Sequence, residues 1–138
     1  MLTELLYSTF GDFLARHDFV EIKDARLGLS IVLSSSAFNI RFSQDRGDVY
    51  VDIIPPLGGG EFYLAETILL LVGVPEDEFV GSEPAALSAM ASAIDRSYDQ
   101  IALLFSAERW KATRARLEEL RLARMLRMFP NMTVVRKN

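Results

Sequence analysis

The spacing of apolar residues predicts an amphipathic helix at the start of the chain, over residues 2–16. Apolar side chains recur there every three or four positions, which places them on one face of a helix; these are Leu2, Leu5, Leu6, Phe10, Phe13 and Leu14. Glu4, Asp12 and Arg16 fall off that face. We therefore expect one side of this helix to cover a core.

An alternation of apolar and polar residues follows, and it predicts strands. Residues 29–35, 38–43 and 48–54 alternate in this way, and residues 19–23 do so over a short stretch typical of an edge strand. Residues 44–47, Gln-Asp-Arg-Gly, favour a hairpin loop in which Gly47 takes a left-handed conformation. The pattern indicates an antiparallel meander of three or four strands.

Beyond residue 60 the spacing becomes helical. Residues 61–72 are apolar nearly all round, which predicts a buried helix that ends at Gly73 and Pro75. Ser82 is placed to cap a long helix over residues 83–105. Ser106 is placed to cap a last helix over residues 107–128, before Pro130. The order is one helix, then strands, then three helices, so the sequence predicts a single α+β domain over 1–130 and a short basic tail at 131–138.

The last helix carries two apolar stripes on opposite sides. One stripe holds Trp110, Thr113, Leu117, Leu120 and Met128, and the other holds Ala112, Ala115, Leu122, Ala123, Leu126 and Phe129. Two interpretations stay open. Either the helix lies in a groove and both stripes meet the core, or the distal stripe meets another chain, as in a homo-oligomer.

Charge divides the chain into two parts. Residues 1–107 hold 6 basic and 16 acidic side chains, a net charge of −10, whereas residues 108–138 hold 9 basic and 3 acidic ones, a net charge of +6. The arginines of the last helix lie among Glu108, Glu118 and Glu119, and the acidic remainder repels phosphate, so we do not expect a nucleic-acid partner. An acidic body favours a basic protein partner instead.

The residue inventory excludes several kinds of site. The chain has no cysteine, and its single histidine is His17, so Cys-based and His-rich metal sites are excluded. Gly58 to Gly60 precede Glu61 rather than the Lys-Ser/Thr of a phosphate loop. The acidic groups at 45–52 and at 76–78 lack calcium-loop spacing. We therefore expect no metal, no cofactor and no enzyme activity.

The start of the chain and its hydropathy bear on location. MLTELLYSTF has no basic segment and carries Glu4, unlike a signal peptide, and the apolar run at 68–74 is far shorter than the roughly 20 residues that span a bilayer. We expect a cytoplasmic protein without a membrane partner.

The strand pair at 38–54 carries the predicted binding site. Tyr50, Asp52 and Arg41 should point away from the core side of Val49, Val51 and Ile53. Asp45 and Asp48 should lie at the hairpin tip, where an aromatic side chain flanked by carboxylates suits a basic partner. The predicted protein-binding residues are Arg41, Asp45, Asp48, Tyr50 and Asp52.

Three stretches together resemble a set of small bacterial proteins. They are IRFSQDRGDVYVDIIP at 40–55, LAETILLLVG at 64–73 and FSAERWKATRARLEELRLARMLRMFP at 105–130. Several members of that set look like the immunity proteins that accompany polymorphic and contact-dependent toxins, and the resemblance carries no catalytic residues. The set has Gly-Phe after the first helix, where this chain has Asp18-Phe19.

Function therefore has one leading interpretation and two alternatives. The leading one is a non-catalytic protein-binding module, of the kind that neutralises a toxin through an acidic surface. A secretion-system chaperone has similar length and charge, but it would return to strands after the middle helix, so a strand within residues 83–128 would favour it. A small enzyme that uses surface carboxylates ranks last, because the chain shows no nucleophile and no metal set.

Overall fold

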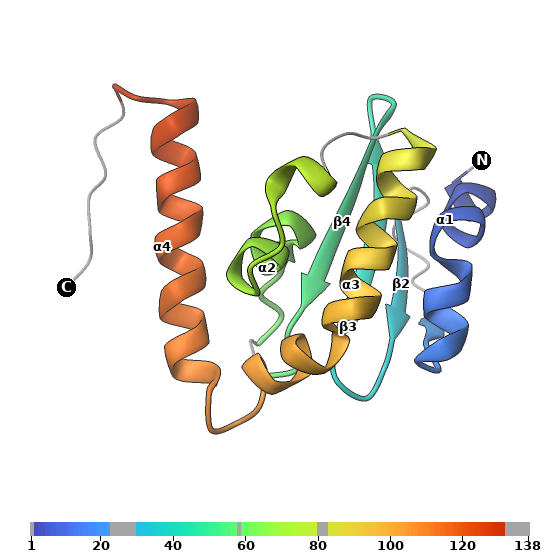
Figure 1. Ribbon diagram of the computed structural model, residues 1–138, viewed down its shortest axis with the longest axis horizontal. Coiled ribbons are helices and arrows are strands. Elements are labelled where there is room, and N and C mark those ends of the chain that lie inside the picture. Colours follow the sequence, from blue (N-terminus) through green and yellow to red (C-terminus); the bar gives the residue numbers. More distant parts are fainter. Residues whose placement is uncertain (1, 23–29, 58, 80–82, 132–138) are drawn as a thin grey trace.

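The computed structural model describes residues 2–22, 30–57, 59–79 and 83–131, and it confirms the α+β class (Figure 1). The elements follow in chain order: α1 (Leu2–Arg16), β1 (Val20–Ile22), β2 (Ser30–Ser34), β3 (Asn39–Asp45), β4 (Asp48–Ile54), β5 (Tyr63–Leu64), α2 (Ala65–Leu71), the short 3-10 helix η1 (Glu76–Glu78), α3 (Pro84–Leu104) and α4 (Trp110–Met128). The described residues from 83 to 131 contain no strand, unlike the chaperone interpretation.

The sheet has five antiparallel strands in the order β1-β2-β3-β4-β5, one or two more than the predicted meander. The additional strand is β5, where the sequence predicted the first turn of a helix over 61–72. Tyr63 pairs with Ile53 and Leu64 with Asp52, so these residues extend the sheet and α2 begins only at Ala65. Backbone pairing with β4 here overrides the local helical pattern, as tertiary context often does.

The β3–β4 hairpin is tighter than predicted. Asp45 pairs directly with Asp48, which leaves only Arg46 and Gly47 in the loop. Their φ angles are +53° and +86°, and two consecutive left-handed residues define the mirror-image turn that matches the twist of antiparallel strands. The predicted loop over 44–47 is therefore wrong at its first two residues, which belong to β3.

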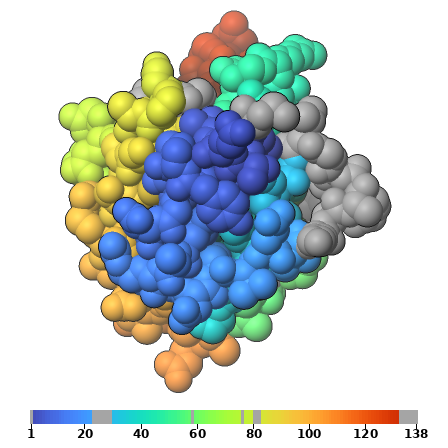
Figure 2. Space-filling model, turned by 90° about the vertical axis from the view of Figure 1, so that its right-hand side faces the viewer, coloured from blue at the N-terminus to red at the C-terminus, as the bar shows by residue number. Residues whose placement is uncertain are grey.

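α1 and α3 pack side by side on one face of the sheet and form the core with it. The rings of Phe10 in α1 and Phe42 in β3 meet edge to face at 5.6 Å between centroids. Figure 2 looks onto α1, with α3 along its left side. The core also includes Leu6, Phe13, Leu33, Phe38, Ile40, Val51, Ile53, Leu87, Met90, Ile94, Ile101 and Phe105.

The helix ends agree only in part with the sequence prediction. Gly73 has a φ of +88°, and its N–H donates to the Leu70 carbonyl while that of Val74 donates to Leu69, so Gly73 ends α2 as predicted. Ser106 does not cap α4, because its hydroxyl donates to the Leu103 carbonyl at 2.7 Å. Ser82, the predicted cap of α3, lies outside the described residues.

α4 lies at the far end of the molecule from α1 and packs on α2 (Figure 1). Thr113 and Leu117 are its buried residues. The first apolar stripe thus faces the body, except for Met128, which is 62% exposed. In the second stripe Leu122 is half-buried and the other five residues are exposed, so the interpretation in which both stripes meet the core is wrong. No described helix is both long and apolar enough to cross a membrane.

Candidate functional site

The side of the sheet opposite α1 and α3 is the candidate site. Side chains alternate along a strand, and directly paired residues share a side. Because Leu33, Ile40 and Ile53 face the core, their neighbours face the other way. We call this side the open face. One row of directly paired residues crosses all five strands of it: Ile22, Val32, Arg41, Asp52 and Leu64. Val20, Tyr50 and Phe62 lie on the same face, beside that row.

The open face exposes large apolar side chains. Val20 is 67% exposed, Ile22 45%, Phe62 46% and Tyr50 42%. Single exposed apolar residues are common on protein surfaces, but several on one face favour an interaction surface. These four residues come from β1, β4 and the segment before β5, so they are spread across the open face from one edge of the sheet to the other.

A paired arginine and aspartate occupy the middle of the open face. Arg41 and Asp52 are directly opposite each other on β3 and β4, and the guanidinium donates from Nε at 3.2 Å and from a terminal nitrogen at 2.9 Å to Asp52 Oδ2. Asp52 is only 4% exposed. Burial raises the pKa of Asp52 by more than the bonds from Arg41 lower it. The ring of Phe62 lies 4.0 Å from the guanidinium of Arg41 and covers the pair.

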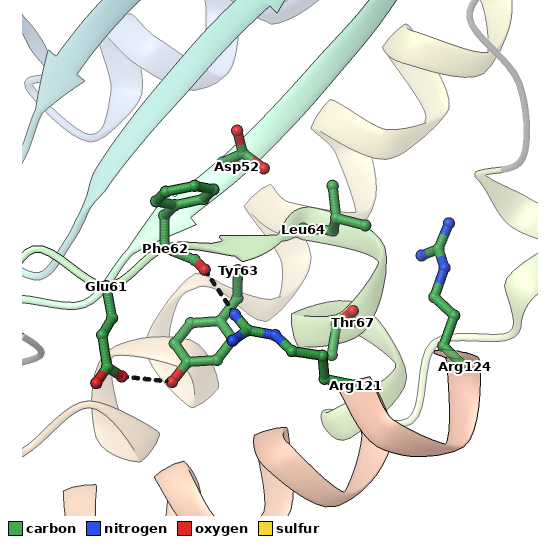
Figure 3. Close-up of a pocket in the computed structure, with 8 residues that line it drawn as sticks. All are labelled: Asp52, Glu61, Phe62, Tyr63, Leu64, Thr67, Arg121 and Arg124. Atoms are coloured by element: carbon green, nitrogen blue, oxygen red, sulfur yellow. Dashed lines mark hydrogen bonds between the residues drawn. The ribbon is translucent and has the colours of Figure 1, made fainter. Parts of the chain in front are cut away.

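A pocket of about 450 Å³ opens beside Asp52, where the open face meets α4 (Figure 3). Phe62 and Leu64 supply apolar walls, and Arg121 and Arg124 reach in from α4. Arg121 lies over the ring of Tyr63 at 4.5 Å and donates to the Phe62 carbonyl at 2.9 Å.

The polar groups of this pocket are already bonded to other parts of the protein. Glu61 is paired with Arg114, Arg121 with Glu118, and Arg124 with Glu66. The Tyr63 hydroxyl donates to Glu61 at 2.7 Å; burial, then the bond to Glu61 and its charge, raise the pKa of Tyr63 far above its usual value. Tyr63 therefore stays protonated and does not act as a base. What the pocket offers a partner is its apolar wall, which suits an inserted side chain.

The five residues predicted as the binding site fall into two groups. Tyr50 is exposed on the open face, and Asp45 and Asp48 lie at the hairpin tip, as predicted. Asp52 is on the predicted side of the sheet but is only 4% exposed, so it is not open to a partner as a binding residue would be. It lies four residues along β4 from Asp48, beside half-buried Arg41.

The aliphatic and aromatic part of the site is absent from the residues that the sequence predicts. The alternation over 19–23 places Val20 and Ile22 on one side of a strand. The helical pattern over 61–72 includes Phe62, whose place on the open face follows from the pairing of β5. The signal in the sequence was therefore present for β1 and absent for Phe62.

A second polar cluster lies between α1 and α3, and it gives His17 a partner. His17 Nε2 lies 2.8 Å from Asp95 Oδ1, and its ring stacks on Tyr98 at 3.9 Å. Arg16 also bonds to Asp95. Burial raises the pKa of Asp95, but the bonds from His17 and Arg16 together outweigh it, so the pKa lies below its usual value. This cluster joins two helices, and we assign it a structural role.

The acidic side chains of the described residues are not grouped as metal ligands would be. Within the described residues, no group of three or more His, Asp or Glu side chains is arranged to hold a metal ion. Glu78 accepts a bond from Arg96 at 2.9 Å. Comparison with protein-family models, with curated proteins and with solved structures gives no match. The function is therefore inferred from the geometry of the site together with the sequence.

Proposed function

We propose that this protein is a non-catalytic module that binds another protein through its open face. The observation that carries this proposal is that four exposed apolar side chains, Val20, Ile22, Tyr50 and Phe62, lie on the same face of the sheet, opposite α1 and α3. Burial of about 25 cal/mol per Å² of apolar surface supplies affinity at such a face. The pocket beside Asp52 accepts an anchoring side chain of the partner.

Charge indicates the chemistry of the partner. Asp45 and Asp48 lie exposed at the hairpin tip, next to the open face, and neither has an ion pair within the described residues. Residues 1–107 carry a net charge of −10. A partner with a basic rim around an apolar centre is therefore steered toward this end of the molecule.

Neutralisation of a toxin is the biological role that we favour for this binding. An acidic surface suits the basic clefts of toxins that act on nucleic acid, and the sequence resemblance to immunity proteins points the same way. The secretion chaperone is the second candidate, and the uninterrupted helices from Pro84 to Leu104 and from Trp110 to Met128 weigh against it.

The test begins with capture of the partner from the source organism and continues with binding kinetics on the purified pair. Tyr50→Ala removes an exposed ring that makes no ring or cation–π contact among the described residues, so it should speed dissociation about tenfold without loss of stability. Asp48→Lys should mainly slow association, and so should added salt.

The matched control is Leu103→Ala. Leu103 is 50% exposed on α3, away from the open face, so this variant should bind like the parent chain. Equal dissociation rates for Tyr50→Ala and Leu103→Ala, together with association that is indifferent to salt and to Asp48→Lys, would contradict the proposal.

A further inference from the structure

The outer face of α4 has the residue spacing of a helix that packs against another helix. Opposite buried Leu117 runs a line of residues separated by three, four, three, four and three positions: Ala112, Ala115, Glu119, Leu122 and Leu126 in the helix, and Phe129 at its C-terminal cap. We call this line the outer seam. Spacing of this kind keeps a seam turned toward a partner along the whole helix, as in coiled coils.

Among the described residues, most of the outer seam is exposed, and only Leu122 is half-buried. Ala112, Ala115 and Glu119 are exposed, Leu126 is 39% exposed and Phe129 57%. α2 lies on the opposite side of α4, where it contacts the face of Thr113 and Leu117. Beside the seam, Met125 adds a further large apolar side chain that is 41% exposed.

Side-chain size along the outer seam changes from small to large. Its first half has the small residues Ala112 and Ala115, and its second half has Leu122, Leu126 and Phe129. An antiparallel copy of the same helix sets the large residues of each chain against the small residues of the other. Alternation of large and small side chains across facing positions is what fills a helix–helix interface.

We propose that two copies of this chain associate through their outer seams, with the two α4 helices antiparallel. Ala112 then faces Phe129 of the second copy, Ala115 faces Leu126, and Glu119 faces Leu122. This inference goes beyond the proposed binding function and uses a different surface, so each dimer presents two open faces. Glu119 is the one polar residue of the seam, and a polar residue at such a position lowers affinity and fixes the register.

The first test measures dimer dissociation by sedimentation of the full chain across a range of concentrations. Leu122→Asp with Leu126→Asp should weaken the dimer at least about a hundredfold, because it places two charges of the same sign in the apolar part of the seam. Glu119→Leu should strengthen it. Leu103→Asp, the same change at an exposed leucine on α3, is the matched control and should leave it unchanged.

The second test uses the absence of cysteine to determine the orientation of the helices. A mixture of the Ala115→Cys and Leu126→Cys chains should form the mixed disulfide on oxidation, because antiparallel pairing brings those two positions together. Disulfides between identical chains alone would indicate a parallel pair and overturn the orientation.

Three results would overturn the association itself. The first is a monomer at every concentration. The second is a dimer that Leu122→Asp with Leu126→Asp leaves intact, and the third is a dimer that Tyr50→Ala weakens instead. Binding of the monomer to vesicles of anionic lipid, lost in the double aspartate variant, would assign the outer seam to a membrane surface. Failure of the toxin-binding test would leave all these results unaffected, since Tyr50 lies on another face.

Discussion

The two ends of the molecule are held to the sheet in different ways. α1 is attached by ring packing: Phe10 and Phe13 are buried and contact each other and the rings of Phe42, Phe19 and Tyr98. α4 buries only Thr113 and Leu117, and it is held in addition by arginines: Arg114, Arg121 and Arg124 reach Glu61, the Phe62 carbonyl and Glu66. Added salt screens exposed ion pairs, whereas it does not weaken apolar packing. α1 therefore depends on the core alone, and α4 depends on a small buried contact together with ion pairs.

The largest expected effect is the loss of a core ring from α1. Phe10→Ala should lower the free energy of unfolding by about 3–5 kcal/mol, because it removes a fully buried ring and leaves a cavity. Phe129→Ala, the same change at the end of α4, should cost less than about 0.5 kcal/mol in dilute solution. Urea unfolding of both variants measures the difference. Similar costs at the two ends would mean that α4 contributes as much to the folded core as α1 does.

The second expected effect concerns the ion pair of the open face. Arg41→Leu leaves Asp52 buried without its partner, which should cost about 3 kcal/mol at neutral pH. Burial then raises the pKa of Asp52 further, so the ionised form is penalised as pH rises above the unfolded value of about 4. The destabilisation should therefore be small at low pH and grow toward neutrality.

The control for that effect replaces both partners. Arg41→Leu combined with Asp52→Leu leaves no buried charge, so most of the lost stability should return. Denaturant midpoints at several pH values measure this. A double variant no more stable than Arg41→Leu would show that the pair contributes through packing rather than charge.

The third expected effect concerns the polar cluster that joins α1 to α3. Asp95→Asn removes the charge that Arg16 and His17 share, which should cost about 1 kcal/mol at pH 7. The pKa of Asp95 is lowered by folding, so its contribution is present above about pH 4 and lost as pH falls below that. The parent and the variant should thus converge in acid. Ser92→Ala, a change at an exposed site one turn away on α3, is the control and should remain close to the parent.

The sequence predicted the elements whose own pattern decides their structure. α1, with its regular apolar spacing, and β4, with its strict alternation, have the predicted bounds. β5 was missed because two residues have no period of their own and pair only when β4 is already in place. For α4 the sequence showed two stripes but not their roles, which depend on where α2 lies.

The sequence predicted which side of the sheet carries the candidate site, but not all of the residues that form it. The alternation of residues correctly predicted that Tyr50 and Arg41 lie on the same side of the sheet. It gave no indication that Phe62 would cover Arg41, because that contact joins segments far apart in sequence. The burial of Asp52 depends on the same contact and on α4, so a polar residue expected in solvent lies instead in a paired, covered position.

The smallest expected effect lies at the end of α1, where one residue adopts a conformation that favours glycine. Asp18 has a φ of +55°, and Phe19 N–H donates to the Leu14 carbonyl at 3.0 Å, which is the bond of a helix end with a left-handed residue. A side chain is strained there, and a negative charge opposes the helix dipole. Asp18→Gly should therefore raise the free energy of unfolding by about 0.5 kcal/mol, despite the greater freedom of glycine in the unfolded chain. Asp18→Asn removes the charge alone and should gain less, and Asp12→Gly, within the helix, should lose a few tenths of a kcal/mol. Thermal unfolding of the three variants distinguishes these contributions; a loss of stability in Asp18→Gly would mean that the aspartate stabilises this end of α1.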